Sequence, residues 1–312
     1  MTKDIAIGIA VTVLITAISM YIPFIGFLFF LLIPLPVFYY RTALGRKKSF
    51  VIPLITFVIA AAFTGGISVD LFLFFELLML GYSLGELFEL NLSIEKTMLS
   101  ATGVLILTAL AGLLFYNFSS DAGVIAIASD YVEKNVGYSL SVYREIGIPE
   151  ENIRMIENSI EEIKYVVVRI LPSLFIASVL LVSWINLLMG RSLFLARKMR
   201  FPEFGPLNKW KSPDYLVWAV IAAGIMLLIP VKDIKIIGVN ALLILLVIYF
   251  FQGIAIVAFF FEKKSAPKIL RIFLYSLIGF QQILLLVIII FGFFDVWVDI
   301  RRLATKEQNY NE

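Results

Sequence analysis

The feature that most constrains this chain is a succession of apolar stretches long enough to cross a lipid bilayer. A membrane-spanning helix needs about 20 such residues, because each adds about 1.5 Å across roughly 30 Å of hydrocarbon. The chain is 61% hydrophobic and 16% charged, whereas soluble domains carry roughly 25% charged residues. We therefore expect an all-α, polytopic transmembrane helical bundle. The candidate spans are 5–20, 24–40, 50–67, 70–85, 98–118, 165–190, 213–231, 236–261 and 271–294.

The number of spans is open between eight and nine. Pro23, Pro34 and Pro36 interrupt the second stretch, which can therefore form a re-entrant element instead of a full span. Losing one span reverses the side of the membrane on which the C-terminus lies.

Lys and Arg residues in the turns predict the orientation, because cytoplasmic loops carry an excess of both. Basic residues gather in 41–49, 191–212 and 262–271, and a cytoplasmic N-terminus places all three segments inside. This threading puts sixteen basic residues in the cytoplasm and nine outside. We expect a multi-pass protein of the bacterial inner membrane. The tail is an exception to the cytoplasmic excess of basic residues, since nine spans leave Arg301 and Arg302 outside.

Residues 119–164 form the one long polar insert, with nine acidic and four basic residues, and the threading places it outside the cell membrane. Its second half is predicted to be an amphipathic helix, because an isoleucine recurs every three or four residues. These are Ile153, Ile156, Ile160 and Ile163. The isoleucines cover the bundle or the rest of the insert in one interpretation, and form a lid or partner surface in the other.

The chain therefore divides into three predicted parts. Residues 1–118 form an N-terminal membrane bundle, residues 119–164 form an extracytoplasmic helical insert, and residues 165–312 form C-terminal membrane helices and a tail.

The composition removes most catalytic chemistry. The chain contains no His and no Cys, so it lacks histidine proton shuttles, thiolate nucleophiles and the usual zinc, haem and iron–sulfur ligands. It also has no glycine-rich phosphate loop and no HExxH or GxSxG motif. We expect no enzymatic activity, no cofactor and no metal site. Because the basic residues lie in short turns, we expect the lipid bilayer as a partner and no nucleic acid.

Glu76 is the most unusual polar residue, since it lies inside the stretch LFLFFELLML. A charged side chain at the centre of a span costs roughly 2.5 to 3.5 kcal/mol on insertion scales. It either contacts a ligand or cation inside the bundle, or ties helices together, and in both cases it should face protein or a polar cavity. Asp70 is expected to cap the helix start. Glu86 and Glu89 lie in a predicted cytoplasmic turn and are expected to be solvated.

Five amide side chains in the predicted spans join Glu76 as ligand-binding candidates. Such amides usually form hydrogen bonds between helices. A carrier needs Glu76 and some of the amides to converge on one cavity, whereas a scaffold leaves them scattered in interhelical contacts. The amides are Asn186, Asn240, Gln252, Gln281 and Gln282, and only one of the adjacent last two can face a given cavity well.

Small residues and prolines follow one another in a recognisable order near the N-terminus. Ala6 and Ala10 lie on an apolar helix, a break follows at Tyr21-Ile-Pro-Phe-Ile-Gly26, and then come the stretch LLIPLPVFYYRTALGRKKSFVIPL and the pair Gly65-Gly66. This order resembles the opening of the substrate-binding S-components of energy-coupling factor transporters. The resemblance implies that the AxxxA motif formed by Ala6 and Ala10 docks an energising module.

Over its full length the chain looks like the YybS-like family of bacterial membrane proteins, a family of unknown function related to S-components. We therefore expect a small-molecule binding or transport subunit that works with a membrane partner or energising module. The alternative is a membrane scaffold or assembly protein that binds other membrane proteins. Association of the chain with itself is compatible with both functions.

Overall fold

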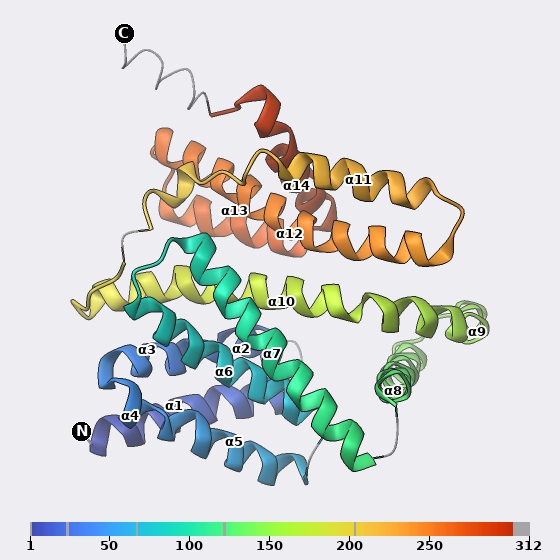
Figure 1. Ribbon diagram of the computed structural model, residues 1–312, viewed down its shortest axis with the longest axis horizontal. Helices are drawn as coiled ribbons and strands as arrows, with labels where there is room; N and C mark the ends of the chain where they lie inside the picture. Colours follow the sequence, from blue (N-terminus) through green and yellow to red (C-terminus); the bar gives the residue numbers. More distant parts are fainter. Residues whose placement is uncertain (1, 23–24, 67, 121–122, 203, 302–312) are drawn as a thin grey trace. The chain divides into compact units, whose positions relative to one another are not determined.

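The computed structural model describes residues 2–22, 25–66, 68–120, 123–202 and 204–301, and every element in these ranges is helical (Figure 1). The predicted break at Pro23 and the placement of Arg302 fall outside the described residues. The chain forms two compact units. Unit 1 comprises Met1–Leu171 and Ser178–Glu203, and unit 2 comprises Pro172–Ala177 and Phe204–Glu312. The three-part division by membrane exposure is a different kind of boundary and stays a prediction.

The all-α polytopic architecture is confirmed. Within the described part of the chain, 7 helices are long and apolar enough to cross a membrane, or up to 8 if one bent helix pair counts as a span. The predicted stretch 213–231 falls short, because its helix α11 (Leu216–Leu228) has only 13 residues.

Unit 1 is built around the contact between its third and sixth helices. A side chain at Gly81 of α6 would collide with the carbonyl oxygen of Pro34 in α3, so only glycine allows the two backbones to pack this closely. Phe38, Phe88 and Phe194 extend this core, with ring centroids 5.0 to 5.3 Å apart. The helices of unit 1 are α1 (Thr2–Tyr21), α2 (Ile25–Leu32), α3 (Pro34–Leu44), α4 (Arg46–Ser49), α5 (Val51–Thr64), α6 (Val69–Glu89), α7 (Ile94–Ser120), α8 (Val124–Glu145), α9 (Glu150–Asn158) and most of α10 (Ile160–Ala196).

The insert is helical, as predicted, but its isoleucines belong to two helices. α9 ends at Asn158 and α10 begins at Ile160. Ile153 is fully buried, whereas the acidic residues of the same segment are exposed. Ion pairs brace the insert, with Arg144 2.6 Å from Glu157. The isoleucine face therefore covers protein, and the acidic face is left to solvent.

The second predicted stretch, which the prolines interrupt, forms two helices of unit 1. α2 and α3 together are long and apolar enough for one span, Ile25–Leu44. Pro34 begins α3, where its missing N–H costs little. The re-entrant alternative for the second stretch is therefore not supported. Instead, α13 (Lys268–Phe280) and α14 (Gln282–Val298) are bent by 101° at Gln281.

The core of unit 2 is the crossing of α14 over α12 (Lys232–Lys263). A side chain at Gly292 would collide with the carbonyl oxygen of Tyr249, and one at Gly253 would collide with that of Ile288. Glycine at both positions therefore brings the two backbones together. The remaining elements of unit 2 are the single turn η1 (Leu207–Lys209) and α11, which packs beside α12.

Candidate ligand cavity and buried polar clusters

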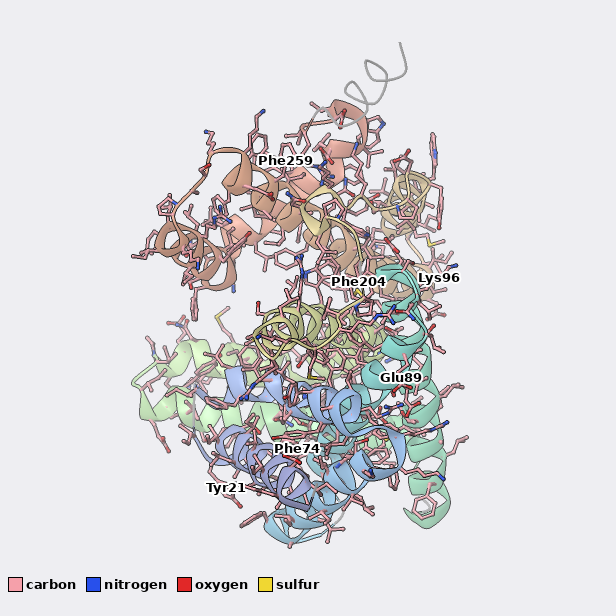
Figure 2. All side chains as sticks on the ribbon, turned by 90° about the vertical axis from the view of Figure 1, so that its left-hand side faces the viewer. Tyr21, Phe74, Glu89, Lys96, Phe204 and Phe259 are labelled. Atoms are coloured by element: carbon pink, nitrogen blue, oxygen red, sulfur yellow. The ribbon has the colours of Figure 1, made fainter. Side chains whose placement is uncertain are left out.

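A cavity of about 490 Å³ lies where α1 and α5 end and α6 begins, in unit 1. Small-molecule sites in proteins usually occupy roughly 300 to 1,000 Å³. Aromatic rings and hydroxyl groups share the lining, and Figure 2 labels two of these residues, Tyr21 and Phe74. The lining residues are Ser19, Met20, Tyr21, Phe30, Phe63, Thr64, Ser68, Asp70, Leu73 and Phe74.

The start of α6 supplies the polar part of this cavity. Ser68 is the N-cap, and its hydroxyl oxygen accepts a hydrogen bond from the Leu71 N–H at 3.1 Å. The expectation that Asp70 caps the helix is therefore wrong, because Ser68 already fills that position. Asp70 lies in the first turn, where the positive end of the helix favours a carboxylate. Its side chain is free to make other contacts.

One such contact comes from the insert. The Tyr131 hydroxyl of α8 donates a hydrogen bond to Asp70 Oδ1 at 3.0 Å. Burial raises the pKa of Tyr131, and the nearby Asp70 carboxylate raises this pKa further. Tyr131 is therefore a neutral hydrogen-bond donor at physiological pH. The insert thus contacts the carboxylate that lines the cavity.

Glu76 faces protein, as expected. Its exposed fraction is 2%, and the Thr108 hydroxyl of α7 donates a hydrogen bond to Oε2 at 2.9 Å. Oε1 is buried and has no hydrogen-bond partner among the described residues. Glu76 therefore links α6 to α7, and it is not among the residues that line the cavity.

Asn186 of α10 forms a hydrogen bond at the break in the second predicted span, between α2 and α3. Its Nδ2 atom donates to the carbonyl oxygen of Leu31 at 2.8 Å and to that of Val182 at 2.7 Å. Leu31 lies at the end of α2, just before the helix is interrupted. A backbone carbonyl at such a break needs an internal donor inside a membrane, and Asn186 supplies it.

Gln252 of α12 belongs to a buried polar cluster in unit 2. Its Oε1 accepts hydrogen bonds from the Ser212 N–H and hydroxyl, and its Nε2 donates to Asp295 Oδ2 at 3.1 Å. Asp295 also pairs with Arg301 at 2.8 Å, and both side chains are 0% exposed. We call these four residues the Gln252 cluster.

Arg301 also fixes the end of the described chain. Its Nη1 atom donates to the carbonyl oxygens of Asn208 and Trp210 at 2.9 and 3.0 Å. Arg301 therefore lies beside the segment that precedes α11. The threading with nine spans placed these two segments on opposite sides of the membrane, so the three predicted spans between them do not all cross it. The short helix α11 fits this result.

The remaining three candidates belong neither to the cavity nor to the Gln252 cluster. Asn240 Nδ2 donates to the Ile236 carbonyl oxygen of its own helix at 2.8 Å. Gln281 forms the break between α13 and α14, Gln282 is the first residue of α14, and both are exposed. The six candidates are thus divided between two units, and none lines the described cavity. Their role in ligand binding stays a prediction.

Glu86 and Glu89 were expected to be solvated in a turn, but both lie on α6. Their side chains are 29% and 56% exposed, and both pair with a buried arginine. Arg41 is 1% exposed, and its guanidinium donates to Glu86 at 2.7 Å and to both carboxylate oxygens of Glu89 at 2.9 and 3.1 Å. Figure 2 labels Glu89. The three-residue spacing of the two glutamates, which places them on one helix face, was the signal available in the sequence.

Ala6 and Ala10 are exposed within unit 1. The inward face of α1 is formed instead by Gly8, Thr12 and Thr16, which are buried. The AxxxA face is therefore not used for packing inside this unit.

The fold defines the protein as a polytopic α-helical membrane protein. The profile of the predicted membrane protein family DUF2232 matches residues 10–296, so the chain belongs to this family. The YybS-like assignment fits this match, which makes no statement about S-components. No curated protein and no solved structure matches the chain.

Proposed function

We propose that this protein is a small-molecule binding subunit of a bacterial inner-membrane transport system. The observation that carries the proposal is the cavity at the end of unit 1, whose volume and mixed aromatic and hydroxyl lining suit a small organic molecule. The orientation is part of the proposal: the N-terminus lies in the cytoplasm, and the cavity and the insert face outward. The chain binds its ligand and catalyses no reaction.

Mass spectrometry of the protein purified in mild detergent tests this function. We expect a small molecule to co-purify with the wild-type chain and to be lost in Ser19→Trp, because the indole would occupy part of the cavity and block the ligand. Leu14→Trp is the matched control, since Leu14 lies on the same helix and is 59% exposed. A molecule retained equally by both variants would place binding elsewhere and contradict the proposal.

The partner that supplies energy is proposed to dock on the face formed by Ala6 and Ala10. Helices in lipid associate through close packing over small residues, and this face is exposed within unit 1. The S-component resemblance assigns docking to the same motif.

The double variant Ala6→Leu with Ala10→Leu is expected to keep the thermal stability of the chain and to lose a co-purifying membrane protein. Extra methylenes in a close-packed contact cost about 1 to 3 kcal/mol at each site, which is enough to break a detergent-stable complex. Ala62→Leu, at another exposed alanine, is the control. Retention of the partner by the double variant, or unfolding of the isolated chain, would refute docking at this face.

A membrane scaffold is the second candidate function. Glu76, Asn186 and Gln252 form contacts between chain segments instead of converging on the cavity. A stoichiometric protein partner without any bound small molecule in the same mass spectrometry experiment would favour this function.

A further inference from the structure

We propose that the cavity of unit 1 binds an organic cation that carries N–H groups and an apolar or aromatic part. This inference rests on the proposed function and names the class of ligand. Three properties of the lining lead to it: its charge, the direction of its hydroxyl protons and its aromatic rings.

The charge of the described lining is negative. Asp70 is the one ionisable carboxylate among the lining residues, and no Lys or Arg is among them. The N-terminal end of α6 has the opposite sign, but its macrodipole amounts to about half an elementary charge. The Ser68 cap satisfies part of that helix end. The full charge of Asp70 therefore dominates, and an anionic ligand would be repelled.

Three of the four hydroxyl groups in the described lining present acceptors, whereas the fourth, that of Ser68, already accepts the Leu71 N–H. The Ser19 hydroxyl donates to the Thr16 carbonyl oxygen at 2.7 Å, and the Tyr21 hydroxyl donates to that of Phe63 at 3.4 Å. The Thr64 hydroxyl lies 3.1 to 3.2 Å from three backbone carbonyl oxygens. Because each proton is directed at the backbone, these groups offer lone pairs to a ligand. A ligand that satisfies them must be a hydrogen-bond donor.

The aromatic rings complete the recognition. Phe30 and Phe74 pack edge to face with centroids 6.0 Å apart, and Tyr21 and Phe63 do the same at 6.2 Å. Aromatic faces attract cations and also accept apolar groups. A primary ammonium group attached to an apolar body matches the acceptors and the rings together.

The test measures binding of three probes to the full-length protein in mild detergent near neutral pH, where Tyr131 is protonated. The probes are the phenethylammonium cation, its N-trimethyl analogue without N–H groups, and the phenylacetate anion. We expect phenethylammonium to bind at least about tenfold more tightly than the other two, since hydrogen bonds to charged groups are among the stronger ones.

Asp70→Asn should weaken phenethylammonium binding by about tenfold or more, because the counter-charge is lost while the shape is kept. Asp130→Asn is the matched control. It removes the same charge from an exposed residue next to Tyr131 that does not line the cavity. Ser19→Trp should abolish saturable binding, and binding that persists in this variant reflects partition into detergent and counts against the inference.

Equal binding of phenylacetate, an unchanged affinity in Asp70→Asn, or no binding of phenethylammonium up to millimolar concentration would overturn the inference. The proposed function fails separately. If an anionic or neutral molecule co-purifies and is lost in Ser19→Trp, the cavity is a ligand site and only the cation class is wrong.

Discussion

Arg301→Met is expected to destabilise the protein by about 3 to 5 kcal/mol, the usual cost of leaving a buried charge without its partner. Asp295 would remain buried without its ion-pair partner, because its side chain is 0% exposed. The carbonyl oxygens of Asn208 and Trp210 would also lose their donor. Asp295→Leu should cost a similar amount, since it leaves the guanidinium unpaired.

The double variant Asp295→Leu with Arg301→Met should be much less destabilised than the sum of the single variants. Replacing both charges by apolar groups removes the unpaired charge, but Gln252 Nε2 still loses its acceptor. A residual cost of about 1 to 3 kcal/mol is therefore expected. Thermal unfolding in mild detergent measures the full double-mutant cycle.

Lys211→Met is the control for this cycle. Lys211 pairs with Asp299 at 2.9 Å, but the two side chains are 31% and 21% exposed. Solvent screens this pair, so we expect a loss of about 1 kcal/mol or less. Additive single-variant effects would show that Asp295 and Arg301 are not coupled and that the Gln252 cluster does not hold unit 2 together.

Glu86→Gln combined with Glu89→Gln is expected to destabilise unit 1 by about 3 to 5 kcal/mol, because Arg41 would stay buried without a counter-charge. Arg41→Met should cost less. The two glutamates are 29% and 56% exposed and can be hydrated once the guanidinium is gone, whereas Arg41 is 1% exposed. We therefore predict that the double glutamate variant loses more stability than Arg41→Met.

The same unfolding assay measures this order. Arg46→Met is the control, because Arg46 lies 3.4 Å from Glu86 but is 75% exposed. It should change stability by about 1 kcal/mol or less. If Arg41→Met proves more damaging than the glutamate pair, burial of an unpaired guanidinium is not the dominant cost.

Hydropathy was sufficient to predict the class of this protein. A backbone inside lipid must satisfy its own hydrogen bonds, so long apolar stretches become helices almost regardless of their neighbours. The isoleucine period of the insert likewise predicted a helix with one buried face, because amphipathic spacing is a local property. The prolines marked a real break between α2 and α3, but they did not reveal the bend at Gln281, where the sequence contains no proline and only Gly279 disfavours a helix.

The candidate site was less predictable. Glu76 was recognised because a carboxyl in an apolar stretch needs a partner, yet the sequence could not show that this partner is Thr108. Asp295 carries the same signal, since it interrupts an equally apolar stretch, but it lies just beyond the last predicted span, 271–294. The cavity left no signal in the sequence, because Ser19, Thr64 and Asp70 come from three helix ends that meet only in the folded chain.

The sequence by itself determined that the chain is an all-helical membrane protein with a polar insert, because periodicity and hydropathy are read along one segment at a time. Only the tertiary structure decided which polar groups meet: Arg41 with two glutamates, Gln252 with Asp295, and Tyr131 with Asp70. Such contacts depend on distance and burial between segments far apart in the chain. The position of a charged residue in the folded chain decides its role. A solvated charge in a loop indicates only the orientation in the membrane, whereas a buried charge needs an ion-pair partner.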